Sequence, residues 1–194
     1  PVLAILFCIL LTAAVVSGIF LFLQYRKEKN KKEEIDKIIY LTQGRIAPFY
    51  EATEIGMSDK TTASALARAY GSTKEEVLDL YHKLGDMGLV AKQLSEKFEV
   101  KNSNLTVGEV FDVLFSIAKT SGEGTVEKKL NLLSELLKKS DSASSKHLVR
   151  IPLGNSRLGI GDPTVLDGLA LAALGDRSKR KLLEKAYNET SDLG

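Results

Sequence analysis

The stretch IGMSDKTTASALARAY, Ile55 to Tyr70, recurs later in the chain as LGIGDPTVLDGLALAA, which starts at Leu158. Five positions match at an offset of 103: Gly56 with Gly159, Asp59 with Asp162, Thr61 with Thr164, Leu66 with Leu169, and Ala67 with Ala170. Turn residues such as glycine and aspartate are harder to match by chance than apolar residues. The stretch therefore predicts a turn followed by a helix, built twice.

A second block extends the repeat. YHKLGDMG from Tyr81 matches YNETSDLG from Tyr187 at an offset of 106. Each copy then contains a turn, a helix, a short loop, a second helix and a turn. With only two copies, we expect a duplicated domain whose halves are related by a pseudo-twofold axis, not a solenoid. The alternative is that helical hairpins of similar length look alike by chance.

The rest of the chain beyond Lys37 also shows helical periodicity, and no sustained alternation typical of strands. Two capping boxes, Thr73 with Glu76 and Thr106 with Glu109, mark helix starts. We predict an all-α fold with helices near residues 34–42, 59–70, 73–84, 88–97, 106–120, 126–139, 142–152, 163–174 and 178–189.

The first residues differ in composition from the rest. Residues 1–23 carry no charge and are long enough to span a bilayer as a helix. Six Lys/Arg against four acids follow between Arg26 and Lys37, which by the positive-inside bias places the remainder in the cytoplasm. We predict a transmembrane-like helix over 1–25, a charged linker or helix extension over 26–37, and a helical domain over 38–194. A cleaved signal peptide is the alternative for the apolar segment.

The composition offers little support for catalysis. The 194 residues are 44% hydrophobic and 27% charged, which is ordinary for a globular domain. Cys8 is the only cysteine, so a disulfide framework is excluded and a structural zinc is not expected. His82 and His147 stand alone, and the sequence contains neither a phosphate-binding GxxxxGK[ST] loop nor HExxH. There is no Lys-x-Asp-Gly, in which a lysine attacks a nucleotide phosphorus.

Positive charge gathers between Lys119 and Arg157. This segment contains eight Lys or Arg residues and four acidic residues, a local excess of +4 in a chain of net charge +2. The eight are Lys119, Lys128, Lys129, Lys138, Lys139, Lys146, Arg150 and Arg157. The whole-chain charge is too small to indicate a polyanion partner, so such a partner depends on this segment.

Two glycine-opened helix starts lie in that region. Gly122 and Gly124 precede a helix expected near Val126, and Gly159 and Gly161 precede one expected after Pro163. Glycines at a helix start let backbone N–H groups turn outward, and with the helix dipole they form a site for one phosphate. Two such starts predict binding to a nucleic-acid backbone with little base specificity. Alternatively, each is an ordinary loop, with Asp162 as a helix N-cap.

At these residues the chain resembles a known family. From about Ile38 to Gly194 it is similar to the N-terminal DNA-binding domain of ATP-dependent DNA ligases of the archaeal and eukaryotic type. The matching blocks are IIYLTQGRIAPFYEATEIGM, YHKLGDMGLVAKQL, LTVGEVFDVLFSIAKTSGEGTVEKKLNLLSELL, HLVRIPLGNSRLGIGDPTVLDGLALA and the closing SDLG. The resemblance implies an all-helical domain that grips the phosphates and minor groove of nicked duplex DNA, together with an adenylation domain and an OB-fold domain.

The resemblance also implies site residues and partners. The implied DNA-binding positions are Gly122, Gly124, Thr125, Lys128, Lys129, Arg150, Arg157, Gly159 and Gly161. The complete ligase would use ATP and Mg²⁺ in DNA replication, repair and recombination, whereas this chain needs no cofactor and would be inactive alone. We expect a monomer. The rival hypothesis is a membrane-anchored helical adaptor that binds protein and not DNA.

Overall fold

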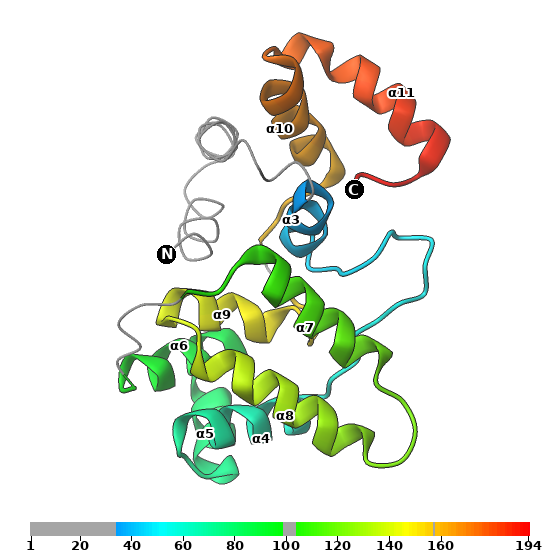
Figure 1. The fold of residues 1–194 in the computed structure, drawn as a ribbon. Helices are drawn as coiled ribbons and strands as arrows, with labels where there is room; N and C mark the ends of the chain where they lie inside the picture. Colours follow the sequence, from blue (N-terminus) through cyan, green and yellow to red (C-terminus); the bar gives the residue numbers. More distant parts are fainter. Residues whose placement is uncertain (1–33, 99–103, 157) are drawn as a thin grey trace.

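The computed structural model describes residues 34–98, 104–156 and 158–194, and all regular structure in them is helical (Figure 1). The all-α prediction is therefore confirmed for the described part of the chain. The elements are α3 (Ile35–Thr42), α4 (Asp59–Tyr70), α5 (Lys74–Leu84), α6 (Met87–Glu96), α7 (Val107–Lys119), α8 (Thr125–Lys138), α9 (Ser142–Arg150), α10 (Asp162–Leu174), the 3₁₀ helix η2 (Arg177–Lys179) and α11 (Arg180–Thr190).

The predicted helix bounds agree with these elements to within two residues. Both capping boxes form: the Thr73 and Thr106 hydroxyls each accept a hydrogen bond from the amide of Glu76 and Glu109, respectively. The backbone N–H groups of the threonines donate in return, and these bonds lower the pKa of both glutamates. Because a cap satisfies donors that a helix cannot satisfy itself, local sequence was enough to locate these starts.

The core lies where α4 packs against α8 and α6 packs against α9. Its largest fully buried side chains include Leu66, Leu114, Leu133, Leu137 and Leu148. Figure 1 shows these helices grouped in one body, crossed by α7, with the α10–α11 hairpin standing apart beyond α3. The described part of the basic segment begins at the end of α7 and continues through α8 and α9.

The same hydrogen bond occurs in both copies of the repeat. Tyr81 on α5 donates its hydroxyl proton to Asp59 at the start of α4, with 3.5 Å between the oxygens. Tyr187 on α11 donates to Asp162 at the start of α10, at 2.7 Å. Since these two aspartates and two tyrosines are the matched positions in the sequence, the contact supports a genuine duplication.

The turn that closes each copy is also repeated. The Asp86 carboxylate accepts from the Gly88 amide at 2.7 Å, and the Asp192 carboxylate accepts from the Gly194 amide at 3.0 Å. Each aspartate also binds a side chain that lies outside the two repeat copies. Arg150 of α9 binds Asp86, and Tyr40 of α3 binds Asp192. Because Arg150 and Tyr40 are not matched positions of the repeat, these two contacts do not test the pseudo-twofold axis, which stays a prediction.

The α10–α11 hairpin is joined to α3 by polar contacts. Gln43 donates to Asp162 at 2.9 Å, and the Tyr40 hydroxyl donates to Asp192 at 2.8 and 2.9 Å. Burial and this carboxylate raise the pKa of Tyr40 above its ordinary value. The start of α10 is thereby fixed next to the end of α3.

The predicted transmembrane segment and most of the charged linker lie outside the described residues. Within the described ranges, no helix is both long and apolar enough to cross a bilayer. The membrane anchor therefore stays a prediction.

His147 of α9 provides a pH-dependent test of the packing. Burial, together with the nearby positive charges of Arg150 and Lys146, lowers the pKa of His147 to about 4 from 6.5. Between these pH values the unfolded chain binds a proton that the folded chain does not, so stability is lost as the pH falls through this window. We expect a loss of up to about 3 kcal/mol from this residue, complete near pH 4.

Urea unfolding of the full chain at a series of pH values measures this loss. The variant His147→Gln keeps a polar side chain but cannot take up the proton, so its stability should change less between pH 6.5 and pH 4. Equal pH dependence in the two proteins would show that His147 is not the responsible group.

Candidate nucleic-acid interface

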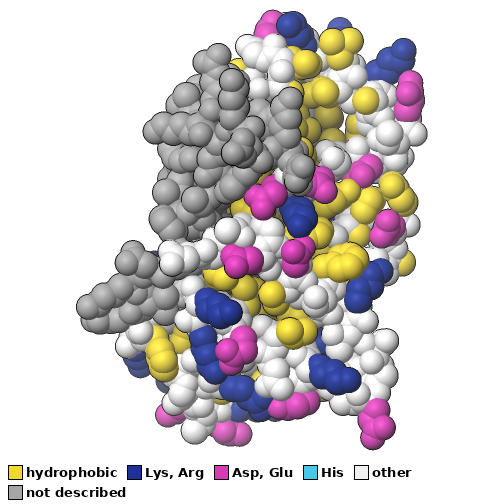
Figure 2. All heavy atoms as spheres, viewed as in Figure 1, with side chains coloured by type: hydrophobic (Ala, Val, Ile, Leu, Met, Phe, Trp, Pro, Cys, Tyr) yellow, Lys and Arg dark blue, Asp and Glu magenta, His cyan; other side chains and the backbone are white. Residues whose placement is uncertain are grey.

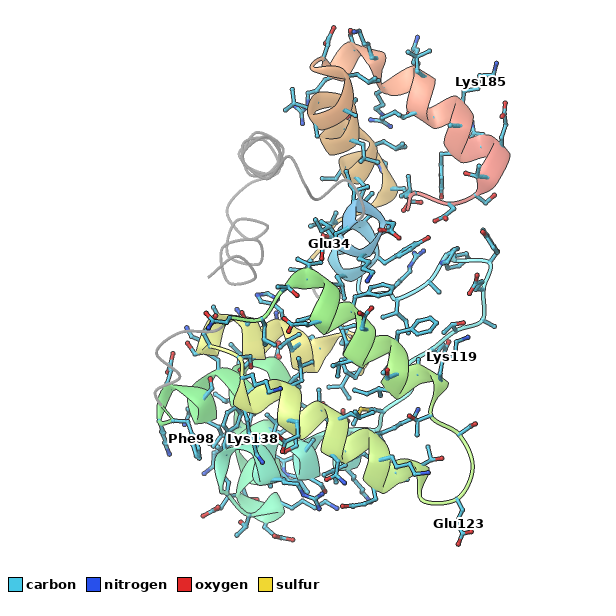
Figure 3. The ribbon with its side chains drawn as sticks, in the orientation of Figure 1. Glu34, Phe98, Lys119, Glu123, Lys138 and Lys185 are labelled. Carbon is cyan, nitrogen blue, oxygen red and sulfur yellow. The ribbon has the colours of Figure 1, made fainter. Side chains whose placement is uncertain are left out.

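The turn between α7 and α8 is open on its outer side. Gly122 and Gly124 adopt φ values of +86° and +72°, a left-handed conformation that favours glycine. A Cβ atom built on either would meet nothing within 4 Å among the described residues. Figure 3 shows Glu123 at the tip of this loop, pointing away from the body. We call the stretch Gly122–Thr125 the first turn.

The first turn leaves amides available at the N-terminus of α8. Gly124 is the N-cap residue, and no side chain caps the helix. The Thr125 amide donates to the Gly122 carbonyl at 3.4 Å, and the Thr125 hydroxyl donates to the same oxygen. Within the described ranges, the next two amides, of Val126 and Glu127, have no acceptor. Uncapped N–H groups at the positive end of a helix dipole suit an anion.

The two lysines after the first turn have different environments. Lys128 is exposed, and no carboxylate of the described residues pairs with it. Lys129 is half-buried, and its ammonium donates to the Ile55 carbonyl at 2.8 Å. Lys128 is thus free to meet a ligand, whereas Lys129 ties α8 to the loop before α4.

The stretch Leu158–Asp162, which we call the second turn, is built differently. Gly159 has φ +63°, like its match Gly56 at +56°, so this glycine serves the repeated turn. Gly161 is the N-cap of α10 with no side-chain cap, whereas its match Ser58 caps α4 by accepting from the Thr61 amide. Where the first copy has the capping hydroxyl of Ser58, the second copy therefore has Gly161, which has no side chain to cap the helix.

Two details of the second turn differ from the sequence predictions. Helix α10 begins at Asp162, ahead of Pro163, because Gly161 occupies the N-cap position. Asp162 is not the cap; its carboxylate accepts from Gln43 and Tyr187 instead. The amides of Thr164 and Val165 both donate to the Gly161 carbonyl, and proline has no N–H, so this turn offers fewer amides than the first.

Arg150 is not part of either turn. Its guanidinium makes two hydrogen bonds to the Asp86 carboxylate, from Nε at 3.2 Å and Nη2 at 2.6 Å, and both side chains are almost fully buried. The charge that the sequence assigned to a basic segment is thus neutralised inside the domain. Arg157 lies outside the described residues.

The loop of residues 43–58 joins the two turns. At its start, Gln43 binds Asp162, and a Cβ on Gly44 would lie 2.7 Å from Ser156. At its end, Lys129 binds the Ile55 carbonyl. Figure 1 shows the turns well separated, with this loop running between them along one edge of the molecule. The loop therefore contacts residues at or near both turns, but the two predicted phosphate-binding turns lie apart from each other.

The face viewed in Figure 2 carries both signs of charge, with acidic side chains among the lysines and arginines. Among the residues that the structure describes, no three His, Cys, Asp or Glu side chains are grouped so as to hold a metal ion. The described geometry offers two helix starts without a side-chain cap, those of α8 and α10, which lie apart from each other.

Comparison with known proteins defines the family. The family described as "DNA ligase N terminus" matches residues 12–170. A "Probable DNA ligase" of Dictyoglomus thermophilum is 45% identical over 166 residues, covering 86% of this chain and 28% of that protein. "DNA ligase 2" of Thermofilum pendens is 42% identical and the "DNA ligase" of Saccharolobus solfataricus 39% identical, each over 177 residues, with 86% of this chain and 30% of the relative covered.

The chain belongs to the DNA ligase N-terminus family. It spans about 28–30% of the length of these curated relatives. The resemblance drawn from the sequence blocks is thereby confirmed at the level of the family.

Proposed function

We propose that this chain binds nicked double-stranded DNA without regard to sequence, as the DNA-binding domain of an ATP-dependent DNA ligase. The observation that carries the proposal is the first turn: two exposed glycines, two backbone amides without an acceptor in the described part of the chain, and exposed Lys128 one turn of helix away. Backbone amides and lysines contact phosphates, which position a protein on DNA but carry no sequence information.

The proposed contacts are a subset of the residues predicted from sequence. They comprise Gly122, Gly124, Thr125 and Lys128 at the first turn, and Arg157, Gly159 and Gly161 at the second. Lys129 and Arg150 are left out because the Ile55 carbonyl and the Asp86 carboxylate already bind their charged groups. Gly159 serves chiefly to form the turn, as its match Gly56 does.

In the complete ligase, we propose that an adenylation domain and an OB-fold domain close around the same DNA, and that ATP and Mg²⁺ supply the sealing chemistry there. Replication, repair and recombination of DNA are the processes such an enzyme would serve. The present sequence has no Lys-x-Asp-Gly. Without this motif we expect the chain not to join strands. We further propose that it binds DNA in the cytoplasm and as a monomer.

Competition between DNA sequences tests the proposal. The full chain is mixed with a labelled nicked duplex and titrated with unlabelled nicked duplexes of equal length but unrelated sequence. Because phosphate contacts dominate, the competitors should displace the label at concentrations within about threefold of one another. Preference for one sequence by a hundredfold, or no binding of any duplex, would refute the proposal.

A further inference from the structure

Two cations of this domain are held over phenylalanine rings. The Lys119 ammonium lies 5.2 Å from the centre of the Phe115 ring, and the Arg45 guanidinium carbon lies 4.8 Å from the centre of the Phe49 ring. A ring attracts a cation through its quadrupole without neutralising the charge. Both cations are therefore positioned by a partner that leaves their charge available to an anion.

Lys119 is placed beside the first turn. It is the last residue of α7, three residues before Gly122, and it is exposed (Figure 3). The Phe115 ring beneath it stacks on Phe111, with 6.2 Å between the ring centres. In the described ranges no carboxylate lies within ion-pair distance of Lys119, whereas Lys37 on the same aromatic row pairs with Asp112 at 3.0 Å.

Arg45 occupies the corresponding place beside the second turn. It follows Gly44, which packs against Ser156. Two residues before Arg45, the Gln43 side chain donates to Asp162 at 2.9 Å, so Arg45 lies close to the start of α10. No carboxylate of the described residues forms an ion pair with it.

Phe49, the aromatic partner of Arg45, is highly exposed. Phe49 has 78% of its surface exposed, the largest exposed fraction among the exposed large hydrophobic side chains of the described residues. Holding Arg45 in place gives this exposed ring a role that core packing does not.

We propose that Lys119 and Arg45 are two further contacts to the DNA backbone, one beside each turn, and that Phe115 and Phe49 position them. The inference rests on the proposed function and extends it. Each cation would neutralise one phosphate and release counterions, whereas each ring would only limit the positions that its cation can adopt.

Salt-dependent binding separates the two roles. The full chain and the variants Lys119→Ala, Arg45→Ala, Phe115→Leu and Phe49→Leu are titrated against one nicked duplex at several salt concentrations. Removing either charge should weaken binding about three- to tenfold and make the slope of log K against log salt shallower by about 0.9. Removing either ring should weaken binding about twofold and leave the slope unchanged, because the charge remains.

Lys185 provides the matched control. It is an exposed lysine on α11, far from the first turn in Figure 3, and Lys185→Ala should change neither affinity nor slope. If Lys119→Ala and Arg45→Ala keep the slope of the parent chain, this inference is overturned while the proposed function stands. If the ring variants reduce the slope as much as the charge variants do, the positioning role is wrong. Salt-independent binding by the parent chain would overturn both proposals.

Discussion

Replacing Arg150 with alanine is expected to lower the free energy of unfolding by about 3–5 kcal/mol, the usual cost of leaving one partner of a buried ion pair alone. The Asp86 carboxylate would then be buried with its two hydrogen bonds from Arg150 lost. Helices α6 and α9 come close together here, since a Cβ on Gly88 would lie 2.6 Å from Arg150 Nε. Little space is therefore left for water to replace the guanidinium. Urea unfolding of the full chain measures the loss.

A double variant distinguishes the ion pair from simple packing. Asp86→Asn combined with Arg150→Met removes both charges but keeps a side-chain oxygen that can cap α6 and an apolar chain of similar length. Because neutral, well-packed replacements of a buried pair are often tolerated, the double variant should recover most of the lost stability. A loss below about 1 kcal/mol in Arg150→Ala would contradict the structural role assigned to this arginine.

Replacing Val126 with aspartate is expected to weaken binding to nicked DNA at least about tenfold, which corresponds to about 1.4 kcal/mol. Val126 is 62% exposed and is the second residue of α8, where its amide has no acceptor among the described residues. A carboxylate there would repel a phosphate bound at the first turn. The fold should not suffer, because an acid in the first turn of a helix interacts favourably with the dipole.

The matched control is Val126→Asn, because asparagine has nearly the same shape as aspartate but carries no charge. It should bind within about twofold of the parent chain, and both variants should unfold at similar urea concentrations. Equal weakening by asparagine and aspartate would indicate that the shape of the valine matters and not the charge, which would argue against a phosphate at this turn.

Local sequence was sufficient to predict the helices. The capping threonines Thr73 and Thr106, and the glycines that adopt positive φ, act within a few residues of themselves, so their patterns can be read along the chain. The repeat could also be found in the sequence, because its turn residues recur at matched positions. Its matched Asp and Tyr residues form the Asp59–Tyr81 and Asp162–Tyr187 contacts.

The site was predicted less completely, because charge alone does not reveal a distant partner. Arg150 belongs to the basic segment in sequence, yet its carboxylate partner is 64 residues away, at the N-cap of α6. Lys129 similarly binds a carbonyl 74 residues away. Arg45, which we propose as a further contact, lies outside the basic segment, and the available signal in the sequence was a phenylalanine four residues after an arginine.

The most direct test of the DNA-binding account is the salt dependence of binding by the full chain to a nicked duplex, measured between about 50 and 200 mM salt. Binding through several phosphates predicts a linear fall of log K with log salt and a slope of about −2 to −5, or about 0.9 for each phosphate neutralised. A slope near zero would contradict the account, since it would mean that the lysines, arginines and open helix starts of this domain do not bind the DNA backbone.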